Sequence, residues 1–187
     1  MIDLELNSST DLKREGKSFY WASFFLPKSS KKKAGILYSI CRYFDDIADK
    51  YSEDQTNFLK DTIKEIKKNK NNKVNVFLQK NKINNSIFID LIEGLILDQQ
   101  KIRIQNKEQL IKYSYHVAGT VGLMMSKIIG VKHEKAARSA IDLGIGMQLT
   151  NIARDVYEDS KMKRIYLPAN LIPDISLKNL TDLHNKS

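Results

Sequence analysis

Two carboxylates one helical turn apart are the feature of this sequence best suited to chemistry. If residues 38–49 form a helix, one face carries four polar side chains at positions i, i+4, i+7 and i+11, namely Tyr38, Arg42, Asp45 and Asp49. Like charges at this spacing repel and destabilise an isolated helix by about 0.2–0.5 kcal/mol. A divalent cation between them would offset that repulsion. Alone the pattern is weak, because acidic pairs on solvated helix faces are common.

A second stretch, residues 148–159, repeats the pattern. Its polar positions i, i+3, i+7 and i+11 are Gln148, Asn151, Asp155 and Asp159, and Arg154 lies beside them. Most of the intervening residues are apolar, and carboxylates are costly to bury on such a helix without a counter-ion. Mg²⁺ prefers oxygen ligands and combines one or two carboxylates with substrate phosphates and waters. Two such helices facing each other across a cavity would therefore form a carboxylate-lined Mg²⁺ site.

The composition is that of a helical globular domain. The chain has 187 residues, of which 42% are hydrophobic, with only 3 Pro and 8 Gly; it suits one domain, or most of one, built from long helices. The net charge is +9, but the lysines cluster at 31–33 and 67–73, which predicts solvated ends and loops. No aromatics interleave with these clusters and no nucleic-acid motif is present, which disfavours nucleic-acid binding. A basic surface of this kind also suits contact with anionic lipid headgroups.

The predicted location is cytoplasmic, either soluble or peripheral to a membrane. The first residues lack the basic and apolar regions of a signal peptide. No apolar run reaches the roughly 18 residues that a membrane span requires. Cys41 is the single cysteine, so the chain forms no internal disulfide, which fits a reducing compartment.

Helical periodicity dominates the chain and strand signals are scarce. Apolar spacing, capping residues and prolines predict helices over about 10–25, 29–50, 53–68, 87–99, 106–129 and 134–159, with a short segment at 74–78. Ser52 is the expected cap of the third helix and Asn106 that of the fifth.

Five segments, taken in order, resemble the squalene/phytoene synthase family, the head-to-head prenyl transferases. The resemblance lies in Lys17-Ser18-Phe19 with Leu26-Pro27, in Tyr38 to Asp49, in Tyr113 to Gly122, in Gln148 to Asp159, and in Arg164-Ile165-Tyr166-Leu167-Pro168. The second aspartate segment, together with the Arg-Ile-Tyr-Leu-Pro run, is the most specific match.

The resemblance implies an all-α isoprenoid-synthase-type bundle around a central cavity between the two acidic helices. It implies Mg²⁺-dependent condensation of two prenyl diphosphates through a cyclopropyl diphosphate. Carried onto this sequence, Mg²⁺ and diphosphate would be held by Asp45, Asp49, Asp155 and Asp159, with Asp46 close by and Asn151 as a further metal ligand. Diphosphate would be bound directly by Arg42, Arg154 and Ser18. The cavity would be lined by Tyr38, Phe19, Tyr115 and Gln148, and Tyr115 and Arg42 would join the four aspartates as catalytic residues.

Three functions stay open. The first is phytoene formation from two geranylgeranyl diphosphates, and its rival within the class is formation of squalene, dehydrosqualene or hydroxysqualene from farnesyl diphosphate. The second is a non-catalytic homologue that assists assembly of a respiratory complex, although a scaffold has no need of four carboxylates in two i,i+4 pairs. The third, a basic adaptor for nucleic acid, would require the lysine clusters to converge on one face.

Three departures from the family pattern affect these expectations. Glu15, Gly16 and Lys17 stand where the family often carries a histidine, and Ser114 replaces a cysteine. Family members also continue with several more helices, whereas this sequence ends at Ser187. Residues 1–187 are therefore expected to form a single, C-terminally truncated domain, as a fragment, an inactive copy or a split subunit completed by a second chain. Without the missing helices, apolar surface of the long helices would be exposed.

Overall fold

The computed structural model describes residues 17–50, 52–99 and 103–171, and within these ranges the regular structure is helical. In chain order its segments are α2 (Lys17–Ala22), the 3₁₀ turn η1 (Ser23–Phe25), α3 (Lys28–Asp49), α4 (Glu53–Lys67), α5 (Lys73–Lys80), α6 (Asn85–Asp98), α7 (Lys107–Ser114), the π-helical turn η2 (Tyr115–Gly119), α8 (Thr120–Ile128), α9 (Glu134–Arg154) and α10 (Val156–Lys161). The predicted all-α class is confirmed. No helix of the described ranges is long and apolar enough to cross a membrane.

Side-chain caps fix the helix starts that the sequence predicts. The Ser52 hydroxyl accepts a hydrogen bond from the backbone N–H of Gln55 at 3.3 Å, and the Asn106 side chain accepts one from the N–H of Gln109 at 2.9 Å. Each bond satisfies one of the N–H groups that a helix start leaves without an intrahelical partner. The segment predicted around residue 76 is the helix α5, which Asn72 caps in the same way.

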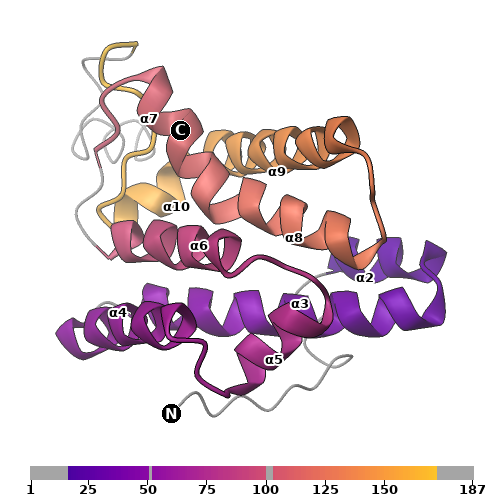
Figure 1. Cartoon of the computed structure of the whole chain (residues 1–187). Helices are drawn as coiled ribbons and strands as arrows, with labels where there is room; N and C mark the ends of the chain where they lie inside the picture. Colours follow the sequence, from indigo (N-terminus) through magenta and orange to yellow (C-terminus); the bar gives the residue numbers. More distant parts are fainter. Residues whose placement is uncertain (1–16, 51, 100–102, 172–187) are drawn as a thin grey trace.

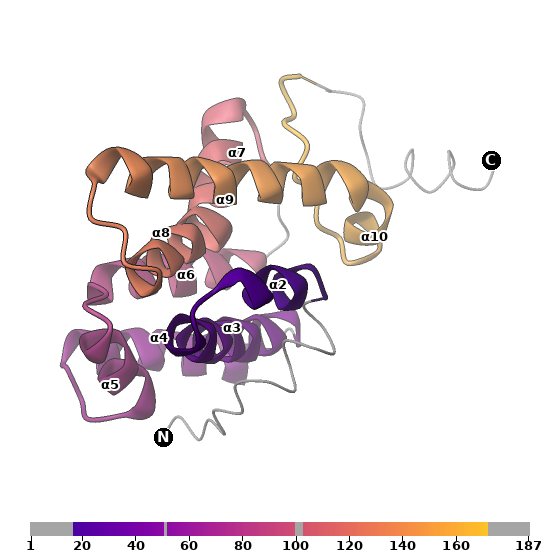
Figure 2. The ribbon, with the colours of Figure 1, turned by 90° about the vertical axis from the view of Figure 1, so that its right-hand side faces the viewer.

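The helices lie in three layers (Figures 1 and 2). Helices α3, α4 and α5 form one layer, α6 and α8 the middle one, and α9 the third. The main core lies between the first two layers, where the fully buried Phe44 of α3 meets Phe88 of α6 edge to face, with ring centroids 5.4 Å apart. Periodic apolar residues on one side of α3 therefore leave its acidic side facing away from the core.

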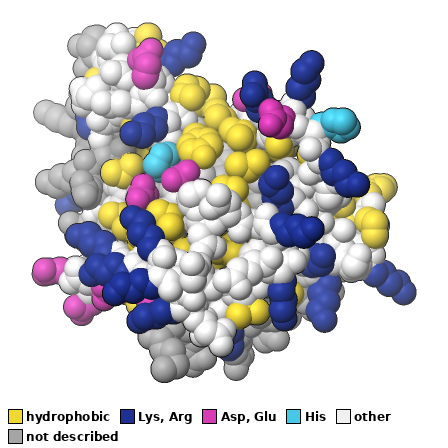
Figure 3. Space-filling view, in the orientation of Figure 1, with side chains coloured by type: hydrophobic (Ala, Val, Ile, Leu, Met, Phe, Trp, Pro, Cys, Tyr) yellow, Lys and Arg dark blue, Asp and Glu magenta, His cyan; other side chains and the backbone are white. Residues whose placement is uncertain are grey.

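Helix α9 crosses the middle layer at two glycines. A Cβ atom at Gly144 would overlap the carbonyl oxygen of Ala118 in η2, and one at Gly122 of α8 would overlap that of Ala140 in α9. These small residues therefore let the backbones touch. On its other side α9 remains open, since Leu143 is 67% exposed and Met147 is 42% exposed. Figure 3 shows hydrophobic atoms gathered over α8 and α9.

Two long predicted helices are interrupted. The helix expected over 106–129 changes to π geometry at Tyr115–Gly119, between α7 and α8. The helix expected over 134–159 ends at Arg154, because Asp155 leaves helical geometry (φ −101°, ψ 19°) before α10 begins. The hydrogen bonds around Asp155 persist, since its N–H donates to Asn151 O at 2.8 Å and its carbonyl accepts from Asp159 N–H at 2.9 Å. The chain therefore bends at Asp155 without separating the two aspartates.

Helix α2 is the described part of the helix predicted over 10–25. Its 3₁₀ extension η1 ends before Pro27, as the proline predicts. Residues 10–16 and the side chains of residues 17–19 lie outside the described part of the structure.

Candidate active site

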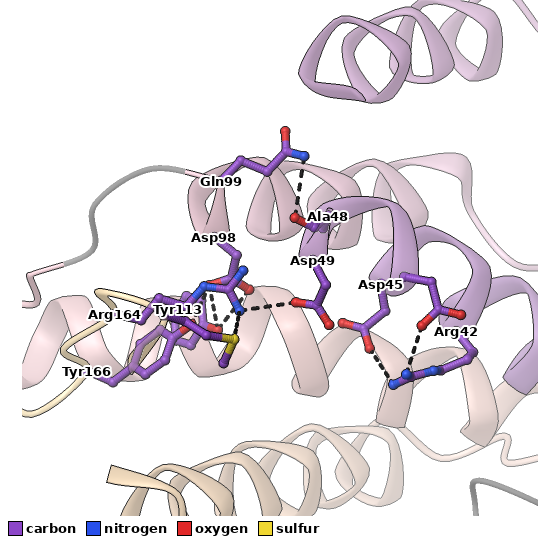
Figure 4. Close-up of polar contacts among 11 residues, drawn as sticks. Arg42, Asp45, Ala48, Asp49, Asp98, Gln99, Tyr113, Arg164 and Tyr166 are labelled. Atoms are coloured by element: carbon purple, nitrogen blue, oxygen red, sulfur yellow. Dashed lines mark hydrogen bonds and ion pairs between the residues drawn. The ribbon is translucent and has the colours of Figure 1, made fainter. Parts of the chain in front are cut away.

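Asp98, the last residue of α6, is the centre of the polar cluster in Figure 4. The Tyr166 hydroxyl donates to one carboxylate oxygen at 2.6 Å, and the Tyr113 hydroxyl lies 2.9 and 3.0 Å from the two oxygens. The two phenol rings stack with centroids 4.8 Å apart, and both residues are 5% exposed. Asp98 is thus a carboxylate held by two buried phenols at the end of an apolar helix.

A short pairing of two distant segments brings Tyr166 to this position. Residues Arg103 and Ile165 form an isolated parallel bridge, in which Ile104 N–H donates to Ile165 O at 3.1 Å. The Arg103 guanidinium also donates to the carbonyl of Leu167 at 3.2 Å. These hydrogen bonds therefore hold the Arg-Ile-Tyr-Leu-Pro run against the segment that follows the C-terminal end of α6.

Arg164 connects this cluster to the first acidic motif. Its Nη1 atom lies 3.1 Å from Asp49 Oδ1 at the end of α3, and its side chain is 11% exposed. The ends of the two helices are also joined by Gln99, whose amide donates to Ala48 O at 3.4 Å. Figure 4 shows Asp45 and Asp49 side by side on α3, with Arg164 reaching Asp49 from the other side.

Arg42 holds the other end of the first motif. It pairs with Asp45 at 3.0 Å and with Asp46 at 2.8 Å, and its side chain is half-buried. The three residues lie within one turn and a half of α3, as the i, i+3 and i+4 spacing predicts.

The second acidic motif continues across the bend, with Asn151 in α9, Asp155 at the bend and Asp159 in α10. Asp159 lies near Arg164, whose backbone N–H donates to Asp159 O at 2.9 Å. Asp155 is engaged by its neighbour Arg154 through two hydrogen bonds of 2.6 Å, and Arg154 is exposed. Asn151 is exposed and Gln148 half-buried on α9. Asp159, rather than Asp155, is therefore the residue of this motif in the electrostatic field of Asp49.

Three carboxyl groups of the site have raised pKa values. Burial, reinforced by Asp49, raises the pKa of Asp45 to about 6. Burial raises the pKa of Asp98 to about 6 against the opposing effects of Tyr166, Arg164 and Tyr113. Burial and the neighbouring Asp155 raise the pKa of Asp159 to about 6. Burial is the largest cause of each shift and neighbouring carboxylates add to it, so the site lacks the solvation and the positive charge that would keep these carboxyls ionised.

The remaining predicted site residues lie elsewhere or outside the described part. The Tyr115 hydroxyl donates to Asp90 of α6 at 3.1 Å, two helical turns from Asp98. Tyr38 is half-buried on α3, one turn before Arg42. The side chains of Ser18 and Phe19 fall outside the described part, although their backbone belongs to α2.

Sequence reasoning assigned no role to Asp98, Tyr113 or Arg164, nor to Tyr166. A signal for Asp98 was present, because it is an acidic residue at the end of the apolar run 87–99, where a charge is costly to bury without partners. The hydroxyl and guanidinium partners come from segments far away in sequence, and no spacing rule connects them to α6.

The donor chemistry of the cluster fits a hard divalent cation, since carboxylate oxygens are the ligands such ions prefer. Within residues 17–50, 52–99 and 103–171, no three acidic, histidine or cysteine side chains lie close enough together to share one ion. Carboxylates of the two motifs instead form ion pairs with arginines, namely Asp45 with Arg42, Asp155 with Arg154 and Asp49 with Arg164.

Comparisons with known proteins agree with this architecture. The profile of the squalene/phytoene synthase family matches residues 12–185. A 15-cis-phytoene synthase of Enterobacter agglomerans is 30% identical over 190 residues, covering 91% of this chain and 64% of that protein. One of Paracoccus sp. is also 30% identical, covering 91% of this chain and 62% of that protein.

Solved structures give the same relationship. A dehydrosqualene synthase crystal structure matches with a TM-score of 0.75 and 32% identity, over 85% of this chain and 59% of that one. A squalene synthase from Alicyclobacillus acidocaldarius matches with a TM-score of 0.76 and 22% identity, over 89% of this chain and 67% of that one, and shows the fold. The chain therefore spans about six-tenths of the length of these relatives. With its family profile matched over 12–185, it belongs to the squalene/phytoene synthase family.

Proposed function

We propose that this chain carries the diphosphate-handling part of a Mg²⁺-dependent prenyl transferase that joins two geranylgeranyl diphosphates head to head into phytoene. The observation that carries the proposal is the position of Arg164, which pairs with Asp49 of α3 and acts on Asp98 of α6 and Asp159 of α10. Asp45, which pairs with Arg42, lies beside Asp49 on α3. The raised pKa values of three of these carboxyls support a role in holding cations.

In the proposed reaction each substrate loses its diphosphate and one proton, and carbon–carbon bonding joins the two prenyl units. Mg²⁺ bound by Asp45, Asp49, Asp155 and Asp159, with Asn151 beside them, would neutralise the charge of the departing diphosphate. The chain's own contribution is orientation. Arg42 and Arg154 already pair with motif carboxylates, and a guanidinium fork suits phosphate oxygens equally well.

Other residues would serve the prenyl chains. Phe19, Tyr38 and Tyr115 would supply an aromatic wall, with Gln148 and Ser18 as polar contacts. Aromatic faces stabilise an allylic cation by roughly 0.5–2 kcal/mol per ring and keep water away from it.

The exposed apolar side of α9 supports a further proposal about completeness. Leu143 and Met147 face outward on a helix adjacent to the site, and the relatives are longer than this chain. We propose that additional helices, in the same polypeptide or a second one, cover this side and close the cavity. Activity would then require both parts.

The test is an assay of the chain together with any polypeptide that completes its fold. With Mg²⁺ and geranylgeranyl diphosphate it should release pyrophosphate and form a C40 hydrocarbon. The same assay is run with farnesyl diphosphate for comparison. A product from farnesyl diphosphate alone, which would have 30 carbons, would assign the chain to the squalene or dehydrosqualene type. No pyrophosphate release from either substrate by the completed protein would favour a non-catalytic homologue.

A further inference from the structure

The two carboxylates of the first acidic motif each meet an arginine. Asp45 and Asp49 lie side by side on α3 (Figure 4), where Asp45 pairs with Arg42 at 3.0 Å and Asp49 pairs with Arg164 at 3.1 Å. Carboxylates spaced in this way suit a divalent cation. Within the ranges that the structure describes, however, no three acidic, histidine or cysteine side chains are grouped closely enough to hold one ion. The arrangement therefore differs from a preformed metal site.

The Arg164–Asp49 pair differs from the other two arginine pairs in burial and in origin. The Arg164 side chain is 11% exposed, whereas that of Arg42 is 40% exposed and that of Arg154 is 69% exposed. Arg42 and Arg154 also pair with carboxylates within four positions of themselves, while Arg164 reaches Asp49 across 115 positions. Salt screens a shielded pair less than an exposed one. Arg164 is therefore the arginine that most strongly determines whether the motif accepts a cation.

The backbone at Arg164 is held independently of its guanidinium. Its N–H donates to Asp159 O at 2.9 Å, and the next residue, Ile165, forms the parallel bridge with the segment after α6. The Nη1 atom also lies 3.9 Å from the sulfur of Met162, a residue that is 51% exposed. The Asp49 side chain is 47% exposed. The ion pair can therefore open by side-chain rotation alone, at a carboxylate that ions reach from solvent.

We propose that Arg164 is a built-in counter-ion of Asp49, and that this ion pair and a divalent cation on Asp49 exclude each other. Two positive groups on one carboxylate repel, and the repulsion is strong where water is partly excluded. A carboxylate left with neither partner would be an uncompensated charge. The guanidinium thus stabilises the metal-free fold and weakens metal binding. The inference rests on the metal role proposed above for Asp45 and Asp49, and it makes Arg164 a positioning residue.

The test measures metal affinity without substrate or pyrophosphate. Mg²⁺ is titrated by calorimetry, and Mn²⁺, which prefers the same oxygen ligands, is counted by electron paramagnetic resonance. Arg164→Gln removes the charge and keeps a polar side chain. It should bind both ions about threefold more tightly or better, because no competing state reduces the binding-competent fraction. Mg²⁺ should also raise the melting temperature more in Arg164→Gln than in the parent. An arginine with only a structural role predicts unchanged or weaker binding.

Two further variants locate the effect. Lys64→Gln also removes one positive charge, but from an exposed pair with Asp61 on α4, and should bind both ions as the parent does. Adding Asp45→Asn to Arg164→Gln should abolish the gain in affinity, because the motif then lacks one of its carboxylates. Circular dichroism checks that each variant is folded.

A measurement on the parent chain serves if Arg164→Gln is too unstable to titrate. A guanidinium held in an ion pair gives distinct Nη–H signals in spectra of protein labelled with ¹⁵N-arginine. Mg²⁺ should shift or broaden those of Arg164 as the pair opens. The signals of Arg138, which lies 3.9 Å from Glu134 at an exposed position on α9, should stay unchanged.

Three results would overturn the proposal. Equal or weaker metal binding by Arg164→Gln, with binding still sensitive to Asp45→Asn, would remove the exclusion and leave the proposed metal role intact. Arg164 signals that persist in the parent at saturating Mg²⁺ would do the same. Metal binding that is absent, or insensitive to both changes, would overturn the exclusion together with the metal role.

Discussion

Arg164 Nη1 lies 3.1 Å from Asp49 Oδ1, joining residues 115 positions apart. The pair connects the end of α3 to the segment after α10, and it lies next to Asp98 and Asp159. Because the guanidinium lowers the pKa of both of these carboxyls against the effect of burial, Arg164 is the main compensating charge of the cluster. One residue of each acidic motif and the buried Asp98 are thus influenced by one guanidinium.

Replacing this guanidinium should destabilise the fold. Arg164→Ala should lower the free energy of unfolding by roughly 1–3 kcal/mol at neutral pH, because it leaves partly buried carboxylates unpaired. The loss should be smaller at pH 5, where Asp98 and Asp159 bind protons because their pKa values are raised to about 6. Urea unfolding at both pH values measures the difference.

Arg154→Ala is the matched control, because Arg154 also pairs with a motif aspartate but is exposed. It should leave the unfolding curve unchanged, since exposed ion pairs contribute little. An equal loss in the two variants would show that burial of Arg164 does not determine its contribution.

The two phenols on Asp98 should contribute unequally. Tyr166→Phe removes the 2.6 Å bond, and should cost about 1–2 kcal/mol and raise the pKa of Asp98 further. Tyr113→Phe removes the longer contact and should raise that pKa less. Carbon-13 NMR titration of the Asp98 carboxyl follows both changes, and a lowered pKa in either variant would contradict the assigned role.

In the absence of metal, the stability of the folded chain should fall as the pH rises through the weakly acidic range. An unfolded aspartate has a pKa near 3.9, whereas burial raises the pKa of Asp45, Asp98 and Asp159 to about 6 in the folded chain. Between about pH 4 and 6 the folded state therefore binds more protons than the unfolded state. The free energy of unfolding should fall as the pH rises through this range and level off above about pH 6.

Unfolding curves across this range test the sign. Asp45→Asn should flatten the slope, since it removes one of the raised groups. Asp61→Asn should not flatten it, because the exposed Asp61 has its pKa lowered by Lys64. Stability that rises steadily from pH 4 to 7 in the metal-free protein would exclude a dominant role for the cluster.

Periodicity and caps were sufficient to predict most of the helices. The apolar side of α3 and the side chains of Ser52 and Asn106 are local signals, and each acts within a few residues. The bend at Asp155 and the π turn at 115–119 escaped prediction. The π turn packs against α6 and α9, and no local pattern in the sequence reports such contacts. The aspartate motifs were found by their spacing, whereas Asp98 was missed because its phenol and guanidinium partners arrive only when the 164–168 run pairs with Arg103–Ile104.

Metal binding should be measurable without turnover. Mg²⁺ with inorganic pyrophosphate should raise the melting temperature, because a ligand that binds only the folded state stabilises it. Asp49→Asn or Asp159→Asn should reduce this increase, and Asp61→Asn should retain it. Chelation should reverse the increase while the circular dichroism of the helices persists. An increase unaffected by either motif variant would place the ion outside the cluster.

The crossing of α9 over η2 should tolerate no added methyl group. Gly144→Ala should cost roughly 1–3 kcal/mol, because its Cβ would overlap the backbone carbonyl of Ala118, which cannot rotate away. Gly146→Ala, two residues later in the same helix, meets no atom within 4 Å and should stabilise the chain by about 0.5–1 kcal/mol through helix propensity. Thermal unfolding of the two variants separates the effect of helix propensity from the effect of the overlap with the η2 backbone. Since the same substitution is made in one helix, opposite signs would establish that α9 lies directly against the η2 backbone, and equal stabilisation would exclude it.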